Sequence, residues 1–173
     1  MDVKSVSTDD FKVAFRWHPA GVGIVTAEAD RGPVAMTVSS LFSVGLEPPT
    51  LVFSASALSS ATPTMLNVKT VVVHMLGAKQ VELAKLGATS GVDRFGEGVE
   101  WRRLPTGEPY YPEAPAWIRG RVAQTVAAGG SHLVVVEALE AWSDKGNAPE
   151  PGVRPLVYHN RSWHEIGEHT KVG

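Results

Sequence analysis

The stretch from Met36 to Val44 reads MTVSSLFSV, and GLEPPTLV follows it directly from Gly45 to Val52. A small polar cluster, Thr37, Ser39 and Ser40, comes where a predicted strand should end. Hydroxyls and free backbone N–H groups at a strand end can hold the polar edge of a flat ligand. Serine and threonine at such a place can equally be turn formers that bond to their own backbone. The residues alone leave both interpretations open.

Strands are predicted on both sides of this stretch. The segment 22–27 is rich in β-branched residues, and a turn at 30–32 joins it to 33–38, so the two segments predict a hairpin. Pro48 and Pro49 cannot donate ladder hydrogen bonds, so we expect them to lie outside the sheet, before a strand at 50–54. The remaining predicted strands cover 71–76, 116–127, 132–142, 155–158 and 162–166, with a loop at 146–152.

Three short helices are predicted. Hydroxyls followed by acids at 7–10 are typical of a helix N-terminus, here for a helix over about 8–16. Thr62 is expected to be the N-cap of a second helix, with Pro63 as its first helical residue. An amphipathic segment at 79–86 predicts the third. No βαβ alternation is present, so short strands joined by Gly/Pro turns favour an antiparallel barrel over a parallel sheet.

Composition excludes several classes of protein. A chain of 173 residues suits one domain, and its net charge of −2 argues against a nucleic-acid binder, which needs basic residues to neutralise phosphates. The absence of cysteine excludes disulfides, thiolate metal sites and a cysteine nucleophile, and it fits a reducing compartment. No apolar run approaches the roughly 20 residues of a membrane span, and the N-terminus has no signal-peptide pattern.

Further polar groups are candidates for binding. Ser54–Ser56 and then Ser59, Ser60 and Thr62 surround the predicted start of the second helix, where they could cap the helix or hold a phosphate. His132 opens a strand after a Gly-Gly turn, and a lone histidine of this kind is more often structural. The segment 87–115 lacks periodicity and contains Asp93-Arg94-Phe95; a loop of this length is usually functional or covered by a partner.

Several well-known motifs are absent from the sequence. It contains no G-x-S-x-G, G-x-G-x-x-G or P-loop motif, which argues against classical hydrolase, Rossmann and P-loop NTPase chemistry. No His/Asp/Glu set has metal-ligand spacing. His159 and His164 are five residues apart, which predicts opposite faces of one strand.

Together these segments resemble the flavin reductase-like, FMN-binding split-barrel family, the reductase components of two-component flavin-dependent monooxygenases. The resemblance covers about residues 11–166. The segments that carry it, in order, are Pro19–Thr26, Met36–Val44, Leu46–Pro49, Ser60–Thr62, Asp93–Phe95 and Gly130–His132.

The resemblance implies a mainly-β fold, a six-stranded antiparallel split barrel with short flanking helices, in a single domain over 1–173. It also implies a homodimer with flavin at the subunit interface. Carried over residue by residue, Thr37, Val38, Ser39 and Ser40 would contact the isoalloxazine and ribityl groups, largely through their backbone. Ser54, Ala55 and Ser56 would line the same face, Ser59, Ser60 and Thr62 would hold the phosphate, Phe95 would lie near the flavin, and His132 near the nicotinamide.

The activity implied is an NAD(P)H-dependent flavin oxidoreductase that passes hydride from NADH or NADPH to FMN or FAD and supplies reduced flavin to a monooxygenase. We expect a cytoplasmic protein without a metal. Ser131 stands where the family motif has an acid, so a flavin-binding carrier or sensor without reductase activity is the alternative. A third reading is a pyridoxamine-phosphate-oxidase-like barrel, against which the absence of basic residues between Arg31 and Lys69 counts.

Overall fold

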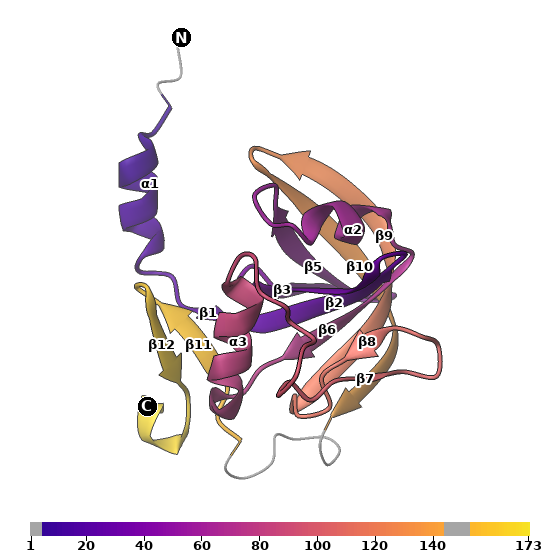
Figure 1. Cartoon of the computed structure of the whole chain (residues 1–173). Helices are drawn as coiled ribbons and strands as arrows, with labels where there is room; N and C mark the ends of the chain where they lie inside the picture. The colour runs from indigo at the N-terminus through magenta and orange to yellow at the C-terminus, as the bar shows by residue number, and fades with distance from the viewer. Residues whose placement is uncertain (1–4, 144–152) are drawn as a thin grey trace.

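Seven antiparallel strands form the main sheet of this computed structural model, which describes residues 5–143 and 153–173. Their order across the sheet is β3-β2-β6-β9-β10-β5-β4 (Figure 1). The strands are β2 (Gly23–Ala29), β3 (Gly32–Val38), β4 (Phe42–Leu46), β5 (Pro49–Ser56), β6 (Thr70–Met75), β9 (Ala116–Ala128) and β10 (Ser131–Ser143). The predicted mainly-β fold is therefore confirmed, although the sheet has seven strands where six were expected. The predicted loop at 146–152 lies outside the described residues.

The additional strand is β4, which sequence analysis did not predict. It pairs with β5 through Phe42↔Val52 and Leu46↔Pro49, so Pro49 lies inside the sheet and its predicted place outside was wrong. Proline is tolerated there because it is the first residue of its strand, where a missing N–H costs little. All five residues of β4 are exposed, so the segment has no alternation of burial by which a strand could be recognised.

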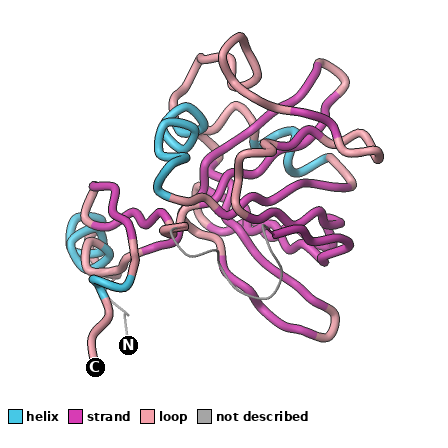
Figure 2. The backbone as a smooth tube through the Cα atoms, turned by 90° about the horizontal axis from the view of Figure 1, so that it is seen from below, coloured by secondary structure: helices cyan, strands magenta, loops and turns pink. Residues whose placement is uncertain are grey.

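Two smaller sheets and three short helices complete the described structure. A three-stranded sheet has the order β1-β11-β12, and a two-stranded sheet joins β7 to β8. These strands are β1 (Ala20–Gly21), β7 (Arg102–Arg103), β8 (Pro109–Tyr110), β11 (Leu156–His159) and β12 (Ser162–Glu165). The helices are α1 (Thr8–Phe15), α2 (Thr62–Asn67) and α3 (Val81–Ala88), with 3-10 turns at 78–80 and 168–170. Figure 2 shows the smaller β1-β11-β12 group beside the main sheet.

Helix α1 begins as predicted but buries none of its residues. The Ser7 hydroxyl accepts a hydrogen bond from the Asp10 N–H at 3.1 Å, which is the N-cap that the sequence indicates. In Figure 1 the helix stands away from the main sheet. Short helices usually gain their stability from tertiary packing, and α1 has no buried residue that would supply it. A helix of this length is marginal in water on its own.

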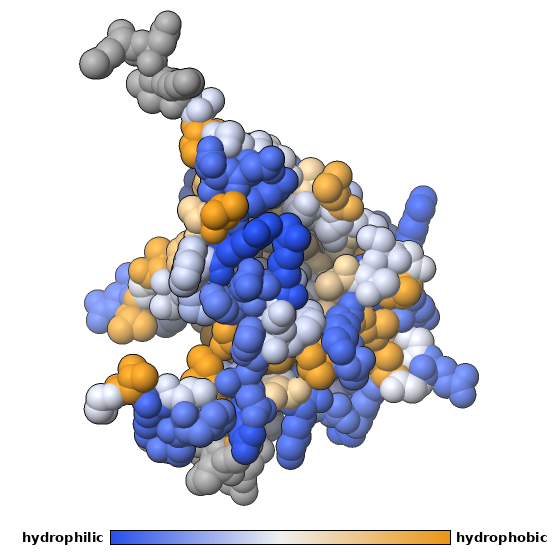
Figure 3. Space-filling model, turned by 90° about the vertical axis from the view of Figure 1, so that its left-hand side faces the viewer, coloured by the Kyte–Doolittle hydropathy of each residue, from blue (hydrophilic) through white to orange (hydrophobic). Residues whose placement is uncertain are grey.

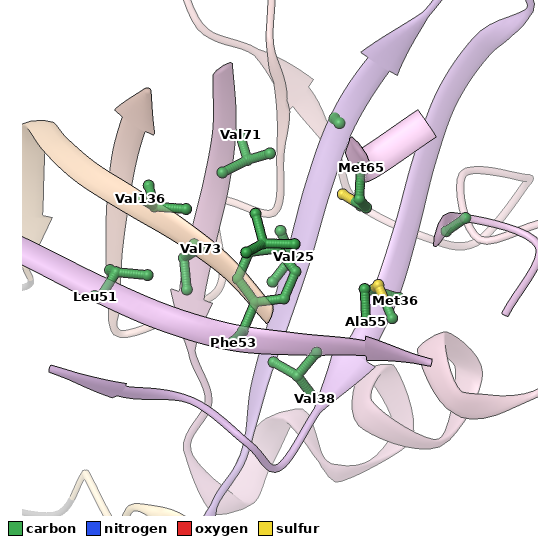
Figure 4. Close-up of a cluster of buried hydrophobic side chains, with 13 residues drawn as sticks. Val25, Met36, Val38, Leu51, Phe53, Ala55, Met65, Val71, Val73 and Val136 are labelled. Carbon is green, nitrogen blue, oxygen red and sulfur yellow. The ribbon is translucent and has the colours of Figure 1, made fainter. Parts of the chain in front are cut away.

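The first core cluster lies inside the curved main sheet, where side chains of β2, β3, β5, β6 and β10 point toward one another (Figure 4). Strand β6 shows how one strand serves two faces. Val71 and Val73 belong to this cluster, whereas Val72 points to the opposite side and packs with Leu104 and Trp117. All three valines are fully buried, and each contributes about 1.5–3 kcal/mol through the apolar area removed from water.

The long segment between α3 and β9 covers the outer face of the sheet and packs there on a second core cluster, which includes Ile24, Leu76 and Ala84. Tyr111 is 1% exposed, and its backbone N–H donates to His74 Nε2 at 3.1 Å. His74 is fully buried, and its Nδ1 lies 2.9 Å from the Ile24 carbonyl oxygen. Because Nε2 accepts a hydrogen bond from the Tyr111 N–H, Nδ1 carries the ring proton and donates to the Ile24 carbonyl oxygen. A neutral imidazole therefore joins β2, β6 and the long segment.

None of the helices in the part of the chain that the structure describes is long and apolar enough to cross a membrane.

Candidate functional site

The end of β5 and the start of β10 lie side by side, and they bring two predicted groups of residues together. Ser54, Ala55 and Ser56 pair in antiparallel register with Leu133, His132 and Ser131, respectively. Ala55 is thus directly opposite His132. This pairing joins residues more than seventy positions apart, and local sequence patterns indicated each strand end only separately.

The Ser40 side chain joins the end of β3 to this paired region. Its Oγ accepts a hydrogen bond from the Ser54 N–H at 2.8 Å and lies 3.3 Å from the Ser54 carbonyl oxygen, to which it donates. Strand β4 pairs with β5 only as far as Val52. The Ser40 hydroxyl therefore hydrogen-bonds to both the N–H and the C=O of Ser54, two residues beyond the last β4–β5 pair.

The Thr37 side chain points to the other side, toward helix α3. Its Oγ1 donates to the Ala84 carbonyl oxygen at 2.7 Å. A Cβ placed on Gly87 would lie 2.3 Å from Thr37 Oγ1 and 2.7 Å from Ile24 Cδ1. Glycine at 87 is what allows α3 to approach the end of β3 this closely, because any side chain there would overlap Thr37.

The loop from Ser56 to Thr62 is closed by its own hydroxyl groups. Ser56 Oγ accepts from Leu58 N–H and Ser59 Oγ accepts from Ala61 N–H, each at 3.3 Å, while the Ala57 N–H donates to the Gly130 carbonyl at 3.0 Å. This last bond ties the loop to the turn that precedes His132.

Thr62 does not cap helix α2, so that prediction was wrong. The N-cap is Ala61, which makes no side-chain hydrogen bond, and Thr62 is the first helical residue. Its Oγ1 donates instead to the Ser56 carbonyl oxygen at 2.6 Å. The Ser56 carbonyl is within reach because the chain folds back from Ser56 to the start of the helix.

Some predicted binding residues can face a ligand only through their backbone. The side chains of Val38 and Ala55 belong to the first core cluster and are 3% and 0% exposed (Figure 4). Ser39 and Ser60, by contrast, are exposed, and their hydroxyls have no hydrogen-bond partner within the described residues. These two hydroxyls are therefore available to a ligand.

His132 has a buried ring nitrogen that lacks a partner. Its Nδ1 is one of two buried side-chain nitrogens or oxygens in the described residues without a hydrogen bond; the other is Arg94 Nε. An unsatisfied buried polar atom costs about 1–3 kcal/mol, so such an atom beside a strand end points to a ligand group that completes it. The donor and acceptor set here consists of hydroxyls, backbone groups and one imidazole. It suits the polar edge of a flat heterocycle and contains no carboxylate pair for acid–base work.

Phe95 lies on the α3 side of the sheet. Its ring stacks on Tyr111 with centroids 5.4 Å apart and meets the edge of Trp101 at 5.2 Å, against the second core cluster. The Trp101 Nε1–H donates to the Phe95 carbonyl at 2.8 Å. The structure thus packs Phe95 in the same cluster as Ala84 of α3, whereas Ser54–Ser56 pair with the start of β10.

No group of three or more metal-ligating side chains occurs within residues 5–143 and 153–173. The two histidines that were predicted to lie on opposite faces of one strand, His159 and His164, instead sit on the paired strands β11 and β12. Their ring centroids are 5.7 Å apart. The prediction was wrong because the hairpin turn falls between them.

Comparison with known proteins agrees with this architecture. The chain is 34% identical over 159 residues to an NADH:FMN oxidoreductase of Rhodococcus qingshengii, a match that covers 92% of this chain and 82% of that protein. It is 30% identical to a flavin reductase domain protein of Arthrobacter sp. FB24, with a TM-score of 0.84 and coverage of 93% and 96%. It is 25% identical to BorF, the flavin reductase component of a bacterial two-component tryptophan halogenase, with a TM-score of 0.80 and coverage of 94% and 99%.

These likenesses define the class as the small flavin reductases. The model of the flavin reductase like domain matches residues 15–167, and the chain belongs to that family. The resemblance found in the sequence is therefore confirmed. Three residues that shape the surroundings of the candidate site were not predicted from the sequence. Gly87 lets α3 approach β3, and His74 and Tyr111 hold the long segment against the sheet. Their partners are distant in sequence, and no local pattern marks them.

Proposed function

We propose that this chain is an NAD(P)H-dependent flavin oxidoreductase that transfers hydride from a nicotinamide to FMN or FAD. The observation that supports the proposal best is the buried Nδ1 of His132, which has no hydrogen-bond partner among the described residues. His132 pairs with Ala55 where the ends of β10 and β5 lie side by side. When bound, the flavin would supply the hydride acceptor and the nicotinamide the donor. The protein then has to align two flat rings and exclude water, which requires hydrogen bonds and packing more than acids or bases.

We assign each residue a role from the hydroxyl, backbone group or ring nitrogen that it can offer to a ligand. The exposed hydroxyl of Ser39 and the backbone of Val38 would meet the flavin ring, while Ser54, Ala55 and Ser56 line the same place from β5. The hydroxyl of Ser60 and the loop around Ser59 and Thr62 would hold the phosphate. His132 would orient the nicotinamide by hydrogen bonding through Nδ1, the ring nitrogen that has no partner among the described residues.

Replacement of His132 by alanine is expected to lower kcat/KM for NADH about tenfold, the effect of losing one aligned hydrogen bond. Flavin affinity should stay near that of the wild type, because Ala55 and Ser54 remain. Steady-state NADH oxidation and flavin fluorescence titration measure the two quantities. His164→Ala, at an exposed histidine on β12, is the control and should change neither. Unchanged nicotinamide kinetics in His132→Ala would remove this residue from the reaction.

A flavin-binding carrier or sensor is the alternative, and Ser131 supports it because the family motif has an acid at that position. Oxidation of NADH and NADPH in the presence of FMN or FAD separates the two functions. Steady consumption of either nicotinamide supports the oxidoreductase. Flavin binding without consumption of either would support the carrier instead.

We also propose that two copies of the chain form a homodimer and that the reduced flavin passes to a monooxygenase partner. Large apolar side chains are exposed on α1 and β4, among them Phe11, Phe15 and Phe42 at 52%, 57% and 56%. Figure 3 shows apolar side chains among the polar ones on the face that carries α1. The likeness to a two-component reductase supports the oxygenase partner. The cytoplasmic location stays a prediction.

A charge introduced on β4 tests the homodimer. Phe42→Glu is expected to shift the mass measured by light scattering from that of a dimer to that of a monomer, because a buried, unpaired carboxylate in an interface is costly. Val172→Glu, at a residue 95% exposed near the C-terminus, is the matched control and should leave the mass unchanged. A wild-type protein that is monomeric at micromolar concentration would contradict the proposal.

A further inference from the structure

The two hydroxyl groups that end the Thr37–Ser40 segment are both used within the chain. Thr37 Oγ1 donates to the Ala84 carbonyl oxygen on α3 at 2.7 Å. Ser40 Oγ accepts from the Ser54 N–H at 2.8 Å and donates to the Ser54 carbonyl oxygen. One hydroxyl thus points to the helix and the other to β5. A hydroxyl has one hydrogen to donate, and in both residues that hydrogen is already engaged.

Val38 and Ser39, which lie between Thr37 and Ser40, are held from two sides. On one side, α3 approaches so closely that a Cβ on Gly87 would lie 2.3 Å from Thr37 Oγ1. On the other, Ser40 extends the edge of β5 beyond the last β4 pair, Phe42↔Val52, by taking the backbone groups of Ser54. Val38 is anchored inward in the first core cluster. What remains free is the exposed hydroxyl of Ser39.

We propose that Thr37 and Ser40 are positioning residues, which fix Val38 and Ser39 between α3 and β5, and that the direct side-chain contact from this segment to the flavin is made by Ser39. The inference rests on the proposed function and divides its binding segment into one residue that meets the ligand and two that hold it. Gly87 belongs to the same device, because it sets how close α3 comes to Thr37.

The first test needs no ligand. In the flavin-free protein, Ser40→Ala removes the acceptor of the Ser54 N–H, so hydrogen exchange at that amide, followed by NMR, is expected to rise about tenfold. Ser39→Ala is the control and should leave the Ser54 amide unchanged. Equal exchange in the wild type and in Ser40→Ala would overturn the role of Ser40.

The second test separates positioning by Thr37 from direct contact. Thr37→Val removes the hydroxyl at constant shape, whereas Gly87→Ala displaces Thr37 and leaves its chemistry intact. Both are expected to weaken FMN binding, measured by fluorescence titration, by about five- to tenfold, and Thr37→Ser should restore it. Because both changes disturb one contact, the loss in the double variant should be smaller than the product of the two. Gly21→Ala, where a Cβ meets nothing within 4 Å, is the control.

The outcomes divide cleanly. Loss of FMN affinity in Thr37→Val but not in Gly87→Ala would make the Thr37 hydroxyl a direct ligand and overturn the proposal, as would full affinity in both. If Gly87→Ala does not fold, as circular dichroism would show, hydrogen exchange at the Val38 amide in flavin-free Thr37→Val decides. Faster exchange than in the wild type supports positioning by Thr37, and equal exchange overturns it. Failure of the wild type to bind FMN or FAD would overturn the proposed function itself, whereas the exchange of the Ser54 amide tests the role of Ser40 in either case.

Discussion

Glu108→Gln is expected to lower the free energy of unfolding by about 3 kcal/mol, because it breaks a buried ion pair and leaves the cation behind. Glu108 is 4% exposed. Its carboxylate accepts hydrogen bonds from Thr70 Oγ1 at 2.6 Å and Arg119 Nε at 2.8 Å, and a third from Thr106. A glutamine cannot neutralise Arg119, whose side chain is only 16% exposed.

The matched control for this variant is Glu137→Gln on β10, because its partner Arg121 lies on β9 as Arg119 does. Glu137 pairs with Arg121, whose side chain is 59% exposed, so its removal should cost less than about 1 kcal/mol. Urea denaturation followed by circular dichroism measures both values. Equal losses in the two variants would contradict the importance assigned to the buried pair.

The pKa of Glu108 adds an acid limit to this stability. Burial raises the pKa, but the hydrogen bonds from Arg119, Thr106 and Thr70 outweigh it and lower the pKa from 4.5 to about 2. The folded state therefore holds the carboxylate ionised where the unfolded chain would be protonated. The contribution is complete above pH 4.5 and is lost as the pH falls toward 2.

Acid is expected to destabilise the protein at higher pH as well, through His74. Burial lowers the pKa of this histidine from 6.5 to about 4, in spite of its hydrogen bond to Ile24. Between these values the unfolded chain binds a proton that the folded protein does not, so the free energy of unfolding falls as the pH falls from 6.5 to 4. The full loss is about 3 kcal/mol, at 1.36 kcal/mol per pKa unit.

Denaturation at a series of pH values measures this window. His74→Gln should be less stable than the wild type at neutral pH, because the bridge from Ile24 to Tyr111 is broken, but its stability should vary less between pH 6.5 and 4. His164→Gln, at an exposed histidine, should keep the slope of the wild type. A wild-type stability that is flat across the window would show that His74 does not set the acid response.

Local patterns predicted much of the fold. β-branched runs located β2 and β6, the Gly-Gly turn located the start of β10, and the hydroxyl and acids at 7–10 located α1. Strand β4 was missed because all its residues are exposed, and its neighbour Pro49 was misplaced because proline normally ends a ladder.

Sequence patterns located two clusters of hydroxyls, at 37–40 and 54–62, as candidates for one binding site, and their membership of a site stays a prediction. The structure brings the two clusters into contact through Ser40 and Ser54, and it pairs Ala55 with His132. The partners of those hydroxyls were not predictable, because Thr37 bonds to a carbonyl 47 residues away and Thr62 to one six residues earlier. A polar side chain near a ligand can bind it or hold the wall that does, and sequence spacing alone does not distinguish the two.

The long segment between α3 and β9 has a consequence for anyone who engineers this protein. Tyr111 donates its backbone N–H to His74 and its hydroxyl to the Arg94 carbonyl at 2.9 Å, and Trp101 closes the turn on Phe95. Apart from β7 and β8 the backbone of this segment is irregular, yet these hydrogen bonds hold it against the sheet. A peptide tag or a graft inserted at Phe95 or Tyr111 would disrupt buried packing and destabilise the fold. The exposed residues 97 and 98 are a site where an insertion should be tolerated.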